Sequence, residues 1–401
     1  MLTKNHRKAS LLKFLSVLFL ITGMVTSCKK ESNNLSTNNA LKSEKSGSEE
    51  GGIKNFIQVN LVANNANYNA AHIDANLKNA WGLAWVASGI AWVNAQAGHV
   101  SNLYNGEGVK LGLTVSIPSP GGPGGNPTGI IFNPNAADFV IPSGNSAPQG
   151  AARFIFVGVD GIVSGWNPTW GTNAFAKFNN VTTSAYTGLA IANNGGSNFL
   201  YAADFRAGKI SVWDRTWASV AMSFTDPNLP AGYSPFNIQQ VNGQLFVLYA
   251  KVGSDGRNQP GKGLGFVDIF TPAGTFVKRF ASRDKLNSPW GVTMAAPTFF
   301  PQKMSDDNEV GNNQVTPQPK ILVGNFGDGK INVYSMHGKF LGQLRTHDQV
   351  LTIDKLWAIG FAPSTSTIDQ NRLYFTAGPN NEEDGLFGYI IKAPVTVEDE
   401  N

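Results

Sequence analysis

The sequence is poor in cysteine and in charged residues. Cys28 is the only cysteine among 401 residues, and Lys, Arg, Asp and Glu together make up 14% of the chain. A single cysteine excludes a fold held together by internal disulfides. The chain is instead rich in glycine and proline, with 44 and 21 residues, so we expect many turns and little helix.

Sequence patterns that carry hydrolytic chemistry are also missing. There is no Gly-x-Ser-x-Gly nucleophile motif, and no two histidines stand at a His-x-His or His-x-x-x-His spacing. A catalytic triad therefore finds little support. We expect the histidines beyond residue 27 to be surface residues: His72, His99, His337 and His347.

The positive net charge comes from the first 27 residues. They hold four cations and no acid, so removing them lowers Lys plus Arg from 31 to 27, against 27 Asp plus Glu. The remaining chain is neutral. A nucleic-acid partner is not expected, because it would require a basic face, unless a local patch is hidden in the neutral total.

The amino-terminal segment resembles a bacterial lipoprotein signal. A basic start precedes the apolar run Leu11–Val25, and Val25-Thr26-Ser27-Cys28 has the order of a lipobox. The run is shorter than the ~20 residues that a membrane span needs, although a transmembrane anchor with an incidental cysteine is the alternative. We expect Cys28 to be lipidated and to anchor the chain in a bacterial cell envelope, on the periplasmic side or at the cell surface.

The chain divides by composition into four parts. Residues 1–27 are the predicted signal peptide. Residues 28–52 are polar and contain no aromatic residue, which predicts a disordered tether. Residues 53–393 alternate in the manner of β-strands, and residues 394–401 form an acidic tail.

A hairpin pattern occurs twice in the β-rich part. Phe199–Asp214 reads FLYAADFRAGKISVWD, and Lys320–Ser335 reads KILVGNFGDGKINVYS. Each has two runs of β-type residues joined by a glycine-containing turn. Similarity at a distance longer than one hairpin indicates a repeat architecture.

A short phrase marks the start of each repeat and occurs six times. The second residues of the six phrases are 47, 59, 49, 54 and 67 residues apart, and propeller blades run to about 40–50 residues before loop insertions are counted. Six repeats predict six blades. The phrases are Ala80–Ala84, Pro127–Ile131, Tyr186–Ala190, Pro235–Ile238, Pro289–Val292 and Leu356–Ile359.

Four strands per repeat are expected, as a propeller blade requires. Repeat three, for example, predicts strands at 187–192, 199–203, 209–214 and 219–225. The sixth repeat offers only three strands, and Asn55–Val62 is a strand that precedes the first phrase. We therefore predict an all-β, six-bladed β-propeller whose last blade is closed by this amino-terminal strand, which removes free sheet edges.

The two hairpins resemble NHL repeats, which carry a similar Ala-Asp turn followed by a basic-Ile-x-Val-aromatic strand. The matching segments are Tyr201–Phe205 with Gly208–Trp213, and Val323–Phe326 with Lys330–Tyr334. The resemblance covers residues 53–393 and extends to an uncharacterised bacterial family of secreted six-bladed propellers. It implies the fold and names no reaction.

Propellers of this class gather two kinds of loop around the mouth of their channel: the turn between second and third strands, and the loop that leads into each first strand. We expect Gln96, Arg206 and Lys355 there. The candidate binding residues are Asn94, Asp204, Asn237, Asn325, Asp328, Trp81, Trp290 and Trp357.

An oxygen-rich mouth suits Ca²⁺, for which Asp204 and Asn325 are the candidate ligands. Lactonase-type propellers, which hold an axial metal with Glu, Asn and Asp, are a comparison. This chain departs from them because no Glu stands at the start of a first strand. Asn and Asp are also favoured in turns for their backbone conformation, so a structural role is the alternative.

Two further groups have competing interpretations. Trp166, Trp170 and Trp217 lie next to turns, where they are free either to stack on sugars or to pack locally, and Trp166 and Trp170 form the best exposed pair. Residues Glu382–Asp384 are expected to form a solvated hairpin loop rather than an acid/base pair.

The leading interpretation is a monomeric, non-enzymatic binding or interaction scaffold. Its ligand is a glycan, a small molecule or a protein at the channel mouth. The alternative is a metal-dependent hydrolase or lactonase that uses Asp204 and Asn325, with Asn94 or Asn237, around one divalent ion.

Overall fold

The computed structural model describes residues 52–300 and 318–394. The chain divides into two units, Met1–Glu44 and Lys45–Asn401, and the described residues belong to the second. The predicted signal peptide and nearly all of the predicted tether and acidic tail lie outside the described residues. In the described part of the chain, no helix is long and apolar enough to cross a membrane.

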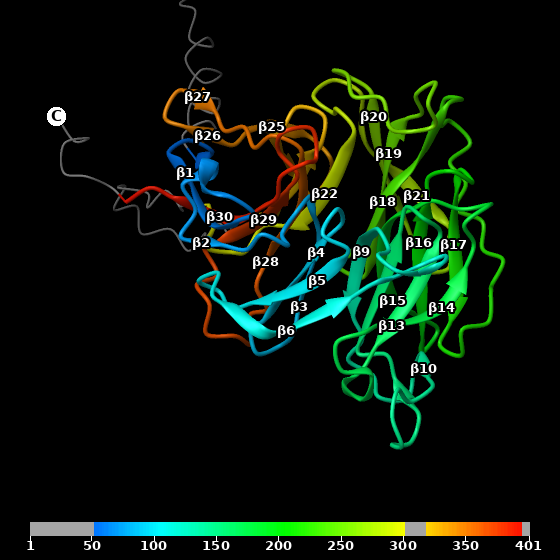
Figure 1. Ribbon diagram of the computed structural model, residues 1–401. Helices are drawn as coiled ribbons and strands as arrows, with labels where there is room; N and C mark the ends of the chain where they lie inside the picture. Colours follow the sequence, from blue (N-terminus) through cyan, green and yellow to red (C-terminus); the bar gives the residue numbers. More distant parts are fainter. Residues whose placement is uncertain (1–51, 301–317, 395–401) are drawn as a thin grey trace, which may run out of the picture. The chain divides into compact units, whose positions relative to one another are not determined.

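Six antiparallel sheets form the blades of a six-bladed β-propeller, which confirms the predicted fold (Figure 1). Each blade starts with an inner first strand, and the first strands of neighbouring blades pack side by side around the axis. Blade 1 comprises β3 (Ala80–Trp85), β4 (Ala91–Ala95), β5 (Val100–Tyr104) and β6 (Lys110–Ser116), and blade 2 comprises β9 (Pro127–Phe132), β12 (Phe154–Gly158), β13 (Ile162–Trp166) and β14 (Phe175–Asn179). Blade 3 comprises β15 (Tyr186–Asn194), β16 (Ser197–Asp204) and β17 (Lys209–Asp214), and blade 4 comprises β18 (Tyr233–Val241), β19 (Gln244–Lys251), β20 (Gly265–Phe270) and β21 (Phe276–Ser282). Blade 5 comprises β22 (Pro289–Met294), β23 (Lys320–Asn325), β24 (Ile331–Ser335) and β25 (Phe340–Gln343).

Blade 6 is built from both ends of the propeller sequence. Its strands are β28 (Leu356–Phe361), β29 (Leu373–Ala377) and β30 (Leu386–Lys392), followed by β1 (Phe56–Ala63) and the short β2 (His72–Ile73). β1 is antiparallel to β30, with Phe56 opposite Lys392 and Ala63 opposite Leu386. The predicted closure of the ring by the amino-terminal strand is therefore confirmed.

The remaining elements are short and lie in loops. Three two-stranded pieces are β7 (Pro118–Ser119) with β8 (Gly122–Pro123), β10 (Val140–Ile141) with β11 (Gly150–Ala151), and β26 (Arg345–Thr346) with β27 (Gln349–Val350). The described part of the chain also has two single-turn 3₁₀ helices, η1 (Ala66–Tyr68) and η2 (Pro168–Trp170).

Blade 3 departs from prediction at its outer edge. Instead of a fourth strand at 219–225, the chain makes one isolated bridge, between Trp213 and Ser219, and then leaves the sheet. Phe224 packs against Phe270 of blade 4, with ring centroids 5.3 Å apart. The nearby Asp226 is buried and forms an ion pair with Arg279 of β21. These contacts draw the segment to the neighbouring blade, and no pattern within the segment itself signals them.

The core consists of layers between blades. Each pair of neighbouring blades, including blades 6 and 1, encloses one cluster of buried apolar side chains, and a seventh cluster lies on the axis. Every blade is therefore covered on both faces. This explains why the inner strands are almost continuously buried and do not alternate cleanly between apolar and polar residues.

A β-bulge recurs at the start of every first strand. In all six blades the ladder between first and second strands contains one extra residue on the first strand, as at Thr187, Phe236 and Trp290. A bulge re-aims the side chain that it carries. We call the second residue of each repeat phrase the axial position, and the six axial residues are Trp81, Thr128, Thr187, Phe236, Trp290 and Trp357.

Small residues follow the axial position because the blades approach closely there. A Cβ atom built on Gly82 would lie 2.2 Å from Thr128 O in the next blade, and one on Gly188 would lie 2.0 Å from Asn237 Oδ1. Four of the six positions are glycine, and the others are Asn237 and Ala358. The repeat phrase therefore encodes the bulge and the contact between blades.

We predict that Phe56→Ala destabilises the ring at its closing strand. Phe56 is fully buried and stacks on Phe299 of the blade 5 loop, with centroids 4.9 Å apart. Removing such a ring from a core costs about 3–5 kcal/mol. The measurement is the shift of the urea unfolding midpoint. Val277→Ala, on the outer strand β21 at 44% exposure, is the control and should change stability by less than about 0.5 kcal/mol; equal shifts would contradict the prediction.

Candidate functional site

Aromatic side chains fill the axis of the propeller. Trp81 and Trp357 stack with ring centroids 3.5 Å apart, and Trp290 meets Trp357 edge-on at 5.7 Å. We call this group the axial cluster. It comprises Trp81, Phe205, Phe236, Trp290, Phe326 and Trp357, all of them buried.

Hydrogen bonds fix the orientation of two of these indoles. Trp290 donates from Nε1 to the Thr187 carbonyl at 2.9 Å, which joins blade 5 to blade 3. Trp357 donates from Nε1 to Asn79 Oδ1 at 2.8 Å, which joins blade 6 to the loop before blade 1. These hydrogen bonds hold the aromatic rings of the axial cluster in a fixed arrangement.

A cavity of about 640 Å³ opens above the axial cluster. Its walls are the loops that lead into first strands and the turns between second and third strands. The structure thus brings together the two kinds of loop expected at the mouth. Trp81, Trp357 and Phe326 contribute to the floor, and Gln96, Arg206 and Lys355 stand around it.

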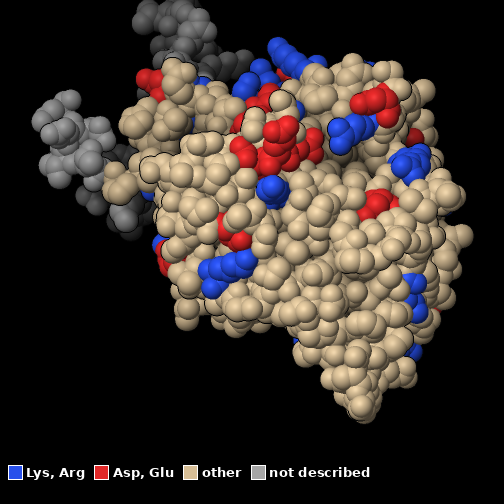
Figure 2. Space-filling model, in the orientation of Figure 1, with Lys and Arg blue, Asp and Glu red and all other residues tan. Residues whose placement is uncertain are grey.

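Few charges line this cavity, and they come from different blades. Arg257 lies in the long β19–β20 loop, Lys355 precedes β28, and Glu382 lies in the β29–β30 turn, joined by Arg206 and Asp255. Figure 2 shows one face of the molecule, on which charged side chains gather over the upper part and are sparse over the lower part that carries β10.

Two of the three cations are available to a ligand. The guanidinium of Arg257 is exposed and has no hydrogen-bond or ion-pair partner among the described residues. The Lys355 ammonium lies 4.8 Å from the centroid of the Phe326 ring. Arg206, in contrast, already donates to the Val181 and Ser184 carbonyls.

Glu382 is held in place by Asn79. Asn79 donates from Nδ2 to Glu382 Oε2 at 2.9 Å, and the same amide accepts the Trp357 indole N–H. Burial raises the pKa of the Glu382 carboxyl above its ordinary value, although the Asn79 amide and the charges of Arg257 and Lys355 oppose the rise.

The backbone around Glu382 has an unusual conformation. Asn380, Asn381 and Glu382 have φ angles of 56°, 55° and 73°, three consecutive residues in the left-handed region. Glutamate adopts this conformation at an energetic cost, and such residues cluster at binding sites. The expected solvated hairpin loop instead presents Glu382 to the cavity and buries Asp384, which accepts hydrogen bonds from Asn64, Asn65 and Tyr68.

Asn94 and Asn237, two of the predicted site residues, link neighbouring blades. Asn94 donates from Nδ2 to the Thr128 carbonyl at 3.0 Å, and Asn237 donates to the Trp290 carbonyl at 2.7 Å. Both side chains are buried, and neither lines the mouth. The carbonyls belong to bulged axial residues, so these amides satisfy backbone groups that the bulge leaves unpaired.

Asp204, Asn325 and Asp328 stabilise turns outside the cavity wall. Asp204 Oδ1 accepts the backbone N–H groups of Ala185 and Ala207, each at 3.1 Å. Asn325 accepts the Asn287 N–H and donates to Asp328 Oδ1 at 3.0 Å. The bonds of Asp204 and Asn325 tie the turn after a second strand to the loop before the first strand of the same blade.

The predicted calcium ligands do not fit an ion at the mouth. The Asn325 amide is engaged by backbone on both its atoms, and neither Asp204 nor Asn325 reaches the cavity. Within residues 52–300 and 318–394, no three His, Cys, Asp or Glu side chains are grouped to hold a metal. Asp204 Oδ2 is buried without a hydrogen-bond partner, and Asp204 belongs to no such group.

The tryptophans expected near turns pack locally. Trp170 donates to the Pro142 carbonyl and Trp217 to the Val140 carbonyl, so both hold the 133–152 insertion that carries β10. Trp166 is 7% exposed and donates to the Gly171 carbonyl. The expectation of an exposed Trp166–Trp170 pair is therefore wrong for Trp166.

Sequence reasoning missed Arg257, Glu382 and Asn79. The insertion 251–263 was visible as a long loop between second and third strands, a position that belongs to the mouth. That loop contains Lys251, Arg257 and Lys262, so its sequence indicated cations near the mouth without distinguishing Arg257. No sequence signal indicates the contact between Asn79 and Glu382, because 303 residues separate them.

We predict that Glu382→Gln increases stability at neutral pH. A carboxyl whose pKa is raised on folding destabilises the native state as pH rises from its unfolded value through its folded value. Glutamine keeps an acceptor for Asn79 and has no charge to desolvate. The variant's advantage in unfolding midpoint should therefore be larger at pH 7 than at pH 4. Glu383→Gln, which removes the same charge from an exposed neighbour, is the control, and an advantage that does not change with pH would contradict the prediction.

Comparisons with known proteins place the chain among relatives whose function is not described. No protein-family model matches it. Two solved structures, virginiamycin B lyase from Staphylococcus aureus and a gluconolactonase from Xanthomonas campestris, are 12% identical with TM-scores of 0.44 and 0.41. They cover 84% and 78% of this chain, and 98% and 86% of their own chains are covered. These values are too low to carry an argument about the site.

Two curated relatives match most of the chain. Uncharacterized protein R648 of Acanthamoeba polyphaga mimivirus is 31% identical over 350 residues, which cover 84% of this chain and 81% of the relative. Uncharacterized protein L690 of the same virus is 32% identical over 352 residues, which cover 84% and 86%. Both relatives are viral, so the comparisons do not support the expected bacterial origin. The chain belongs to the family of six-bladed β-propellers that includes these mimivirus proteins.

Proposed function

We propose that this protein is a ligand-binding propeller and that the mouth cavity takes a small organic anion with an apolar ring. The observation that carries the proposal is the presence, in one cavity, of an aromatic floor and of Arg257 and Lys355, two cations that form no ion pair among the described residues, with Lys355 lying over the Phe326 ring. A cavity of about 640 Å³ lies within the size range of small-molecule sites. The aromatic floor gives the ring its apolar contact, and the cations give its charged group a partner.

Glu382 contributes selectivity in this proposal. Its carboxyl accepts a hydrogen bond from Asn79 and interacts electrostatically with Arg257 and Lys355, so in its ionised form it repels an anionic group that approaches these cations. A ligand that also donates a hydrogen bond gains the Glu382 carboxylate as an acceptor. The mouth therefore favours an anion with a donor group over a simple inorganic anion.

The alternative, a calcium-dependent hydrolase or lactonase, has no described contact in its favour. Its proposed ligands Asp204 and Asn325 are engaged in turns outside the cavity wall. A binding scaffold needs only a cavity and its charges. We therefore place binding ahead of hydrolysis.

The proposal predicts that Arg257→Ala and Lys355→Ala weaken the binding of aromatic anions. The probes are benzoate and phenyl phosphate, with neutral benzamide as their uncharged counterpart, titrated by calorimetry. Loss of a charged hydrogen bond costs about 1.5–3 kcal/mol, so each variant should weaken binding by about 10- to 100-fold. Arg215→Ala removes a half-exposed arginine outside the cavity and should leave binding unchanged. Benzamide binding as tightly as the anions, or no binding of any probe, would contradict the proposal.

We also propose that Cys28 is lipidated and anchors the propeller in a cell envelope. Support comes from the sequence Val25-Thr26-Ser27-Cys28 behind an apolar run, and from the absence of another cysteine. Residues 1–51 lie outside the described residues. We expect the anchored protein to be a monomer that binds no nucleic acid.

The anchor proposal predicts that Cys28→Ser abolishes lipid labelling. The full chain, expressed in a bacterium fed labelled palmitate, should carry the label and sediment with membranes. The serine variant should carry none, because an oxygen in place of the thiol cannot form the thioether. A labelled serine variant, or an unlabelled wild-type chain, would overturn this assignment.

A further inference from the structure

A second cavity lies at the other end of the propeller axis. Its volume is about 210 Å³, and it is lined by residues that follow the axial position along the first strands. Trp81, Phe236 and Trp357 of the axial cluster face the mouth cavity, whereas Trp290 faces this one. The axial cluster therefore separates two cavities, and we call the second the lower cavity.

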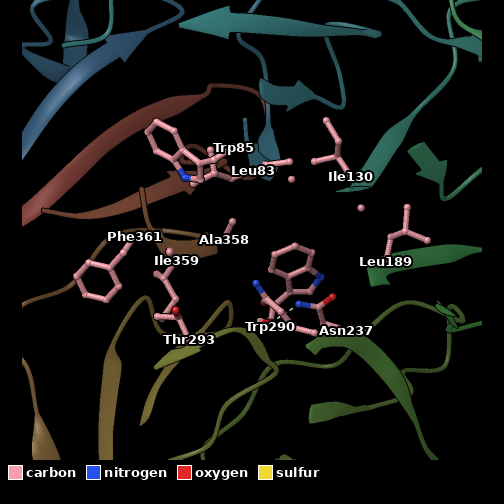
Figure 3. Close-up of a pocket in the computed structure, with 15 residues that line it drawn as sticks. Leu83, Trp85, Ile130, Leu189, Asn237, Trp290, Thr293, Ala358, Ile359 and Phe361 are labelled. Atoms are coloured by element: carbon pink, nitrogen blue, oxygen red, sulfur yellow. Dashed lines mark hydrogen bonds between the residues drawn. The ribbon is translucent and has the colours of Figure 1, made fainter. Parts of the chain in front are cut away.

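The lower cavity has no charged residue in its wall. One side is apolar and comes from blades 1, 2, 3 and 6, with Leu83, Ile130, Leu189 and Ile359. The other side is polar and comes from blades 4 and 5. In Figure 3, Trp290 and Asn237 lie together on one side, and Leu83, Trp85 and Ile130 lie opposite. The two walls thus differ in polarity across the axis.

Three polar side chains of the lower cavity can form further hydrogen bonds. The amide of Gln239 has no hydrogen-bond partner among the described residues. The Nε1–H of Trp85 is buried without an acceptor. Among the described residues, the Thr293 hydroxyl makes a single hydrogen bond, to the Met294 carbonyl at 3.4 Å. A buried donor without an acceptor is costly, and a ligand atom at that position would remove the cost.

We propose that the lower cavity binds one neutral sugar ring. A sugar presents an apolar face of C–H groups and an edge of hydroxyls, and this matches one apolar and one hydrogen-bonding wall. The absence of charge disfavours ionic ligands, because desolvating an ion there would have no compensation. A cavity of 150 Å³ holds a benzene-sized molecule, so 210 Å³ leaves room for a single substituted ring.

The aromatic side chains give this ligand a surface for stacking. Trp290 forms the floor, and Trp85 and Phe361 stand at the wall. Trp85 is braced edge-on by Tyr374, with centroids 4.8 Å apart, and Phe361 by Phe299 at 5.2 Å. The apolar face of the sugar would pack on these rings while its hydroxyls reach Gln239 and Thr293.

Gly360 provides a way to close the lower cavity without disturbing the fold. It lines the cavity, and a Cβ atom built on it meets no heavy atom within 4 Å. Gly360→Leu should therefore fill part of the cavity at little structural cost. Gly112 of β6 is exposed, lies outside both cavities and also has open space around a Cβ atom. Gly112→Leu is the matched control.

The test uses the full-length chain and saturation-transfer NMR. The probes are the methyl glycosides of glucose, galactose and mannose, with glucuronic acid as a charged counterpart and cyclohexanol as an apolar ring. At least one methyl glycoside should bind more tightly than both counterparts. Its affinity should fall at least about tenfold in Gly360→Leu and in Gln239→Ala, and should be unchanged in Gly112→Leu.

Three outcomes would overturn the proposal. If no methyl glycoside binds in the millimolar range, the sugar assignment is wrong. If Gly360→Leu leaves glycoside binding intact, the lower cavity is not the site. If cyclohexanol binds and the glycosides do not, the cavity takes a purely apolar ring. Binding of benzoate at the mouth is measured in the same variants and should not change, so this proposal and the proposed function fail independently.

Discussion

The close approach of six inner strands to one axis is the constraint on which the rest of the structure depends. Each strand places an extra residue at the same point of its ladder, and a small residue follows it in all but one blade. The exception, Asn237, donates to the carbonyl of Trp290 in the neighbouring blade. In four blades the axial residue is a Trp or Phe, and these four side chains belong to the axial cluster. The blades are therefore tied together at the centre, and the loops at either end are free to vary.

The fold was predictable because the close approach of the inner strands requires a recurring sequence phrase. The phrase recurs with each blade, and its six occurrences predicted six blades. The sixth repeat has only three strands, which predicted the closing role of Asn55–Val62. The outer edge of blade 3 was not predictable. Its departure depends on Arg279, which lies more than fifty residues from its partner Asp226 and belongs to another blade. Local patterns do not contain such contacts.

The candidate site was predictable in position and less so in its residues. Repeat geometry indicated which loops meet at the mouth, but Asn94, Asp204 and Asn325 form hydrogen bonds to backbone groups rather than facing the cavity. Arg206 and Lys355 line the cavity as expected. The charges that sequence patterns did not indicate, Arg257 and Glu382, lie in an insertion and in a turn, and the position of Glu382 depends on the distant Asn79. The axial cluster also gives the two ends of one channel different chemistry. One end carries charge and the other does not.

The pairing of β1 with β30 has a consequence for biosynthesis. The strand that leaves the ribosome first has to wait for the strand that leaves almost last, because Phe56 lies opposite Lys392. At a synthesis rate of about 5–20 residues per second, that wait lasts roughly 20 to 70 s. Throughout it, Phe56 has no core to cover it, because the cluster that buries it is built from the late blades 5 and 6. For most of its synthesis the chain thus exposes a β-strand without its partner strand. A chaperone that binds early would act at this strand.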